Sequence, residues 1–178
     1  MSEHDAWIQT YSGRAFYPLR PQTEDICLID IAHGLSNLCR YNGQCRMFYS
    51  VAEHSMHLSH AVPSHLARWA LLHDASEAYL CDIPRPIKPL LPRYQEIERN
   101  VMHAIAIRYN LIWPEPEVLH KYDTRILLNE QAILHPNPPK PWSIPGEPLE
   151  NVHIRGLEPL YARMFFLDRC EELGIRDE

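Results

Sequence analysis

The most apolar part of the chain is Leu66-Ala67-Arg68-Trp69-Ala70-Leu71-Leu72-His73-Asp74-Ala75-Ser76-Glu77. Its apolar side chains leave almost no polar face, so we predict a buried central helix over residues 64–80. Three ionisable residues, His73, Asp74 and Glu77, close this apolar run. Burying such groups unpaired is strongly unfavourable, so they must be paired, neutralised or bound to a cation. A divalent ion would satisfy all of them.

Further helices are predicted on both sides of this segment from apolar residues that recur at helical spacing. They cover residues 29–38, 50–62, 94–109, 118–134 and 158–173. Three prolines in 82–89 predict a stiff extended loop, and the prolines of 135–148 predict an ordered irregular loop. Residues 1–25 are expected to form an irregular, hairpin-like arm. Because 178 residues suit one domain, we predict a single all-α domain over 1–178.

The composition argues against several classes of protein. A formal net charge of −6 without a basic run disfavours binding to a nucleic-acid polymer. No apolar run approaches the roughly 18 residues that cross a bilayer, and the N-terminus lacks a signal-peptide pattern, so we expect a cytoplasmic protein without a membrane partner. Five irregularly spaced cysteines disfavour a disulfide framework and a thiolate zinc site. Eleven histidines justify a search for a metal or acid–base site.

Two further polar residues interrupt apolar helical stripes elsewhere in the chain. His54 is the polar member of the stripe in 50–62, and Asp123 is the polar member of the stripe in 118–134. Together with His73 and Asp74 they would make a His2Asp2 ligand set. The alternative is that each is a hydrogen-bonded or salt-bridged core residue, and periodicity alone does not choose between the two. His33 lies near the stripe of the first helix and is a weaker candidate.

Glu77 is placed to act on a water molecule beside such an ion. It is four residues after His73 and three after Asp74, so on a helix it lies over the same spot one turn along. A carboxylate beside a metal ion, without binding it, is where a general acid or base would lie. We therefore predict that Glu77 handles protons rather than binds the ion.

The order of these motifs along the chain resembles that of the HD-domain metal-dependent phosphohydrolases. The first-histidine motif of the bacterial 5′-deoxynucleotidases is similar to Val51-Ala52-Glu53-His54-Ser55. Their next two motifs resemble His73-Asp74-Ala75-Ser76-Glu77 and Cys81-Asp82-Ile83-Pro84-Arg85-Pro86-Ile87-Lys88, and their last resembles Lys121-Tyr122-Asp123. The resemblance covers most of the chain and implies a helical bundle made of one HD domain.

A second resemblance is to a phage and prophage branch of this superfamily, which includes the phage dATP triphosphohydrolases. It rests on the strings Asp30-Ile31-Ala32-His33, Cys39-Arg40-Tyr41 and Tyr49-Ser50-Val51-Ala52. Position by position, the resemblance implies four metal ligands (His54, His73, Asp74, Asp123), two catalytic acids (Glu77, Asp82), two phosphate contacts (Arg40, Lys88) and two base contacts (Tyr41, Pro86). Tyr41 is a departure, because the relatives carry tryptophan there, which leaves the base preference open.

The implied activity is hydrolysis of 2′-deoxynucleotides, either of dNTPs to tripolyphosphate or of 5′-monophosphates to phosphate. Imidazole and carboxylate ligands suit Mn, Co, Ni, Fe or Zn better than Mg, and a second divalent ion could arrive with the substrate phosphates. Guanosine tetraphosphate or a cyclic nucleotide is an alternative substrate, and a catalytically silent nucleotide-binding regulator is an alternative class. The relatives imply a homo-oligomer in a bacterial or phage-infected cytoplasm, with Trp7, Trp113 and Trp142 as candidate interface aromatics.

Overall fold

The structure is a computed structural model, and it describes residues 5–177. It is mostly helical, which confirms the predicted all-α class. The N-terminal arm is a small antiparallel hairpin of β1 (Ile8–Gln9) and β2 (Ala15–Phe16). The helices are α1 (Leu28–Asn37), α2 (Val51–Ala61), α3 (Ala67–Leu72), α4 (Glu77–Leu80), α5 (Pro92–Arg108), α6 (Leu119–Leu134) and α7 (Pro159–Glu172).

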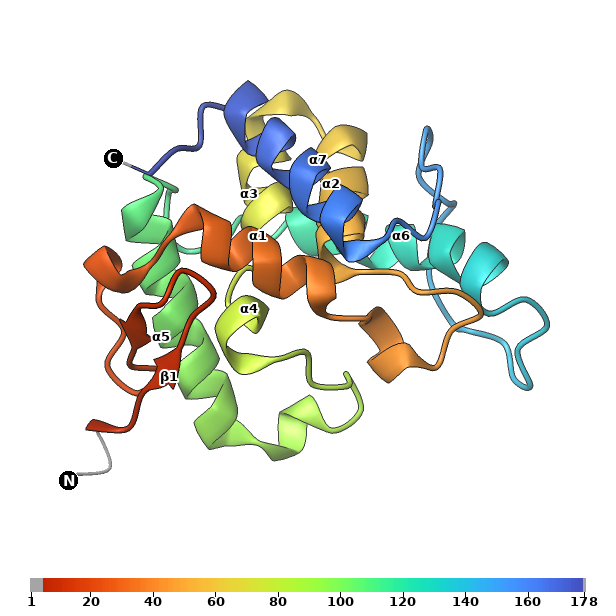
Figure 1. Cartoon of the computed structure of the whole chain (residues 1–178). Helices are drawn as coiled ribbons and strands as arrows, with labels where there is room; N and C mark the ends of the chain where they lie inside the picture. The colour runs from red at the N-terminus through yellow and green to blue at the C-terminus, as the bar shows by residue number, and fades with distance from the viewer. Residues whose placement is uncertain (1–4, 178) are drawn as a thin grey trace.

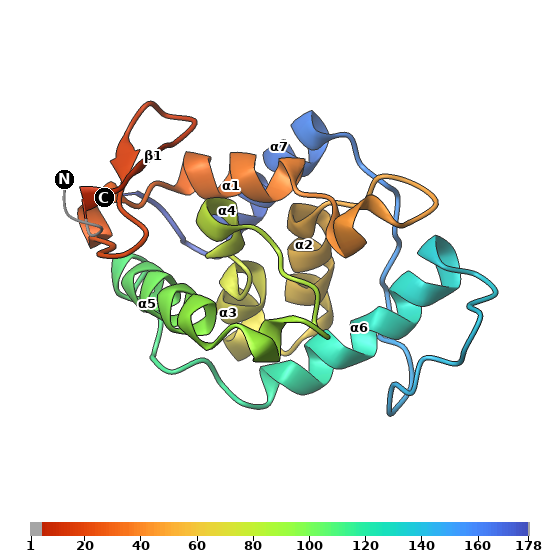
Figure 2. The same cartoon turned by 90° about the horizontal axis from the view of Figure 1, so that it is seen from below.

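The helices α2 and α3 lie at the centre of the bundle and pack against each other. Helix α1 contacts α2, α4 and α7, and α2 also contacts α6 and α7, so most of the α2 surface is covered (Figures 1 and 2). The core is built from fully buried aliphatic and aromatic side chains of these helices, including Ile31, Leu58, Leu71 and Phe166. Of the polar residues on α2, His54 and its neighbour Glu53 are therefore fully buried.

The central helix predicted over 64–80 is wrong as one continuous element. A 3-10 turn over Ser64–Leu66 leads into α3, which ends at Leu72, and α4 begins only at Glu77. Between them the backbone forms hydrogen bonds of the 3-10 type, in which an amide donates to the carbonyl three residues earlier. These bonds run from Ala75 N to the Leu72 carbonyl and from Glu77 N to the Asp74 carbonyl. The imidazole Nδ1 of His73 lies 2.9 Å from the Ala70 carbonyl, which regular helical bonding would use for a backbone amide. The polar motif thus occupies a turn between two helices.

The proline-rich segment 82–89 is only partly the extended loop that was predicted. Its first residues are extended, but Pro84 then accepts backbone bonds from Ile87 and Lys88, and a 3-10 turn covers Lys88–Leu90. Proline at the first position of a helix costs no hydrogen bond, so α5 begins at Pro92, two residues before the predicted start. The other proline-rich segment, 135–148, is irregular as expected.

Other predictions from composition can be compared with the described residues. All five cysteines, which lie within the described residues, are free thiols. Among residues 5–177, no helix combines the length and apolar character needed to span a membrane. Of the three candidate interface tryptophans, Trp7 is exposed, but Trp113 packs against the core and Trp142 lines a cavity. Trp113 and Trp142 are therefore half-buried, and their role in an interface stays a prediction.

Gly34 allows α4 to approach α1 closely, and α4 carries Glu77. A methyl group added at Gly34 would lie 2.8 Å from the Ala78 Cβ and 2.9 Å from its Cα. We expect Gly34→Ala to lower the free energy of unfolding by about 1–3 kcal/mol, because overpacking outweighs the roughly 0.5–1 kcal/mol that alanine gains in a helix. Urea denaturation measures this change. A midpoint equal to or above that of the wild type would contradict the close packing of α1 on α4.

Candidate metal centre

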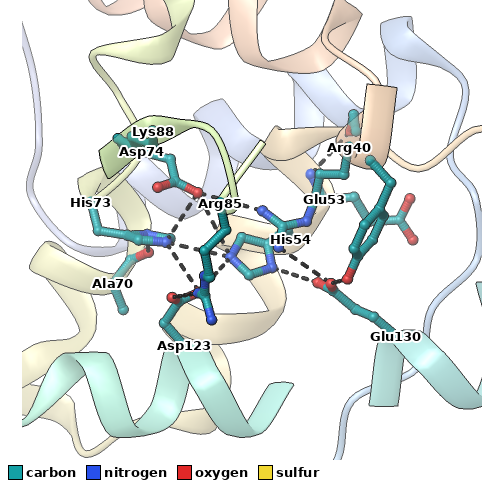
Figure 3. Close-up of polar contacts among 12 residues, drawn as sticks. Arg40, Glu53, His54, Ala70, His73, Asp74, Arg85, Lys88, Asp123 and Glu130 are labelled. Atoms are coloured by element: carbon teal, nitrogen blue, oxygen red, sulfur yellow. Dashed lines mark hydrogen bonds and ion pairs between the residues drawn. The ribbon is translucent and has the colours of Figure 1, made fainter. Parts of the chain in front are cut away.

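Three side chains from separate parts of the fold converge on one point (Figure 3). His54 comes from α2, His73 directly follows α3, and Asp123 comes from the second turn of α6. The two Nε2 atoms are 3.4 Å apart, and Asp123 Oδ1 lies 3.3 Å from that of His54 and 3.7 Å from that of His73. These three residues form a group that could hold a metal ion.

The size of this triangle fits a first-row metal ion. The point equidistant from the three atoms lies about 2.0 Å from each, and such ions bind His and Asp ligands at about 2.0–2.2 Å. Without a cation, two ring nitrogens and a carboxylate would face one another at the end of a buried cleft. A donor set of two imidazoles and one carboxylate leaves further coordination positions open, and the kind of ion stays a prediction.

The outer nitrogen of each imidazole is held so that the inner nitrogen is free to bind an ion. His73 Nδ1 lies 2.9 Å from the Ala70 carbonyl, and since a carbonyl can only accept, Nδ1 carries the hydrogen. His54 Nδ1 lies 2.6 Å from Glu130 Oε1 and donates to that carboxylate. Metal-binding histidines are oriented in this way by carbonyls and carboxylates behind them. In their neutral forms, both imidazoles therefore direct an Nε2 lone pair at the centre.

Asp74, the fourth predicted ligand, lies beside this group. Its Oδ2 is 3.1 Å from His73 Nε2 and 3.8 Å from His54 Nε2, and it also pairs with Arg40 Nη1 at 3.6 Å. Asp74 is outside the set whose ligand atoms all lie close to one another, which contains only His54, His73 and Asp123. Its role as a ligand stays a prediction, whereas its contact with both imidazoles follows from the structure.

The protonation states reflect how these groups compensate one another. Burial disfavours the charged form of His73, but the carboxylates of Asp74 and Asp123 outweigh it and raise the pKa of His73. Burial would likewise raise the pKa of Asp74, but His73 and His54 lower it to about 2. The same two imidazoles hold the pKa of Asp123 well below its usual range against the effect of burial. The cluster thus uses protonated imidazole to balance its carboxylates, a task that a cation can take over.

Glu77 lies beside the cluster with an unsatisfied carboxyl oxygen. Its Oε2 is buried and has no hydrogen-bond partner among the described residues. Burial, followed by the charges of Asp74 and Asp82, raises the pKa of Glu77 well above the ordinary value. Asp82 also has a raised pKa, through burial and the nearby Asp74. A buried polar atom without a partner points to a missing group at this position, which fits the predicted acid–base role.

The cluster opens into a cavity of about 1070 Å³. Its lining includes all of the predicted substrate contacts, namely Arg40, Tyr41, Pro86 and Lys88, together with Glu77 and Asp82. Lys88 is held by Glu98, with Nζ 2.8 Å from Oε1. On the side of the cavity formed by Tyr41, the rings of His135 and Trp142 lie 4.6 and 5.9 Å from the tyrosine ring. The cavity therefore joins an acidic, imidazole-containing end to an aromatic wall.

Several residues of the site were not predicted from the sequence as site residues. Glu130 is the most central, and its only sequence signal is its place seven residues after Asp123 on the same helix face. Arg85 lies in front of the cluster, with Nη2 3.5 Å from Asp123 Oδ2 (Figure 3). His33, the weaker candidate ligand, instead stacks on Tyr11 and contacts Arg163.

Two bacterial proteins are similar to this chain. The Escherichia coli K12 protein YfdR is 38% identical over 175 residues, a match that covers 95% of this chain and 96% of YfdR. A protein of Rhodobacter capsulatus is 39% identical over 123 residues, covering 62% of this chain and 63% of that protein. Both are described as uncharacterized. No model of a known protein family matches the chain.

Proposed function

The chain belongs to the same protein family as YfdR, and we propose that it is an HD-type, metal-dependent phosphohydrolase of 2′-deoxynucleotides. One observation carries the proposal: the triangle of His54, His73 and Asp123 lies next to the unpartnered, buried carboxyl oxygen of Glu77. Both features are at one end of a cavity large enough for a nucleotide.

His54, His73 and Asp123 would hold the ion, with Asp74 as a fourth ligand. When bound, a divalent transition ion polarises a phosphoryl oxygen and acidifies water for attack on phosphorus. In its ionised form Glu77 would take the proton of the attacking water, and the raised pKa makes this carboxylate a stronger base. Asp82, also lining the cavity with a raised pKa, can return a proton to the leaving oxygen.

Arg40 and Lys88 would bind the phosphate groups. Arg40 lies between the two ends of the cavity, with Nη1 3.6 Å from Asp74 Oδ2 and its Cζ 5.5 Å from the centre of the Tyr41 ring. Its planar fork suits two phosphate oxygens, while Lys88 offers a point charge. A substrate with phosphate at Arg40 then has its base near Tyr41, and Pro86 lines the same cavity. This order of contacts favours a nucleotide over a simple phosphate ester.

Product analysis tests the proposal. Protein stripped of metal and reloaded with Mn²⁺, Co²⁺, Ni²⁺, Fe²⁺ or Zn²⁺ is incubated with panels of dNMPs and dNTPs. We expect turnover that depends on the ion and is abolished by chelation. Phosphate as the inorganic product identifies a 5′-deoxynucleotidase, and tripolyphosphate identifies a triphosphohydrolase.

Two outcomes would overturn the proposed function. Ion-dependent hydrolysis of guanosine tetraphosphate or of a cyclic nucleotide, without turnover of deoxynucleotides, would assign another substrate class to the same site. Tight binding of a nucleotide without turnover under any ion would favour a catalytically silent regulator.

A further inference from the structure

Glu130 is a fully buried carboxylate whose two oxygens serve different ends of the cavity. Oε1 accepts the Nδ1 hydrogen of His54 at 2.6 Å, and neither side chain is exposed to solvent. Oε2 accepts from the hydroxyl of Tyr41 and from Arg40 Nη2, the latter at 3.3 Å. One side chain therefore touches a metal-ligand candidate, a phosphate-contact candidate and the aromatic wall (Figure 3).

The contact of the Tyr41 hydroxyl with Glu130 also helps to hold an unusual backbone conformation at Tyr41. Tyr41 and Asn42 have φ values of 57° and 51°, in the left-handed region that bulky residues avoid. Such conformations persist when surrounding contacts hold them, and the contact of the Tyr41 hydroxyl with Glu130 is one such contact. The hydroxyl is thus used internally, which leaves the ring face for the cavity.

We propose that Glu130 is a positioning residue that couples ion binding at His54 to ligand binding at Tyr41. An ion on His54 Nε2 favours the ring orientation in which Nδ1 points at Glu130 Oε1. This holds the carboxylate in the position where Oε2 meets Tyr41 and Arg40. By reciprocity, a ligand that orders Tyr41 strengthens ion binding. The inference rests on the proposed metal site but makes a separate claim about Glu130.

Cobalt binding and nucleoside binding test this coupling together. Co²⁺ affinity is measured by chelator competition and from the visible absorption bands of bound Co²⁺, and the affinity for 2′-deoxyadenosine is measured by calorimetry with and without Co²⁺. Deoxyadenosine has no phosphate to lose, so it reports binding alone. In the wild type we expect Co²⁺ to tighten deoxyadenosine binding at least about 5-fold.

Two variants test separately the contact of Glu130 with His54 and its contact with Tyr41. Glutamine has one acceptor oxygen, so Glu130→Gln cannot serve His54 and Tyr41 on separate oxygens, and we expect Co²⁺ affinity to fall about 10–100-fold. Tyr41→Phe keeps the ring but removes the hydroxyl. We expect it to retain Co²⁺ affinity within about threefold while Co²⁺ no longer tightens deoxyadenosine binding.

Glu53 provides the matched control. It is also a fully buried glutamate, next to His54 in the chain, but its oxygens accept from the backbone amides of Arg155, Gly156 and Leu157. Glu53→Gln should lower stability yet leave Co²⁺ affinity and the coupling unchanged. Unaltered Co²⁺ affinity in Glu130→Gln, or full coupling in Tyr41→Phe, overturns the role of Glu130. Absence of Co²⁺ binding in the wild type instead overturns the metal site, and this inference with it.

Discussion

Replacing His73 by alanine is expected to abolish stoichiometric metal binding and to lower turnover at least about 10³-fold. The variant loses one of three ligand atoms in a triangle whose edges are 3.3 to 3.7 Å. An ion that contributes several kcal/mol to the transition state corresponds to about three orders of magnitude in rate. Metal content by elemental analysis and turnover on the deoxynucleotide panel measure the two effects.

His65→Ala is the control for this substitution, because His65 is exposed on the turn before α3 and lies outside the cavity. It should leave metal content and turnover within about twofold of the wild type. Because His73 is largely buried, unfolding of the variant must be excluded by circular dichroism. A folded His73→Ala protein with the metal content of the wild type would show that the ion, if any, binds elsewhere.

Replacing Glu77 by glutamine is expected to lower kcat about 10²–10⁴-fold, the range for loss of a general acid or base. Metal content should stay within about twofold, since Glu77 is not among the ligand candidates His54, His73 and Asp123. Glutamine has nearly the shape of a protonated glutamate, which burial favours at this position, so the fold should tolerate it. Steady-state kinetics on the metal-loaded variant measures the change.

The exposed Glu117 provides a comparison, because Glu117→Gln removes the same charge outside the cavity. It should keep kcat within about twofold of the wild type. If Glu77→Gln turned over like Glu117→Gln, Glu77 would have no acid–base role, although the metal centre could still stand. A loss of metal together with a loss of kcat would instead make Glu77 part of the ion's ligand shell.

Apolar periodicity singled out His54, His73 and Asp123, because a polar residue on a buried helical stripe must be compensated by something inside the fold, but it did not choose between a metal ion and a core ion pair. The same reasoning placed α2, α5, α6 and α7 to within a few residues. It depends only on local spacing, which the chain carries whatever its tertiary arrangement. Asp74 follows His73 directly in the sequence, and its contact with that imidazole was likewise anticipated.

Local spacing does not report which residues far apart in the sequence come into contact, so these contacts could not be predicted. The helix predicted over 64–80 is interrupted at 73–76. There the His73 side chain donates a hydrogen bond to the Ala70 carbonyl, and the backbone forms hydrogen bonds of the 3-10 type. Trp142 has no periodic pattern around it, so nothing indicated that it would pack near Tyr41 and line the cavity.

Glu130 shows most clearly which features the sequence determines and which depend on tertiary packing. Its helix, its face and its spacing from Asp123 are all properties of the chain, and they place it on the same helix face as Asp123. Its partners, His54 and Arg40, are 76 and 90 residues away in sequence. Only the packing of α6 against α2, which carries His54, and against the 3-10 turn Arg40–Gly43 brings them within hydrogen-bond distance. Sequence periodicity therefore identified some of the buried polar groups, such as His54, and the tertiary structure decided how they compensate one another, because compensation depends on distances that only the packed helices define.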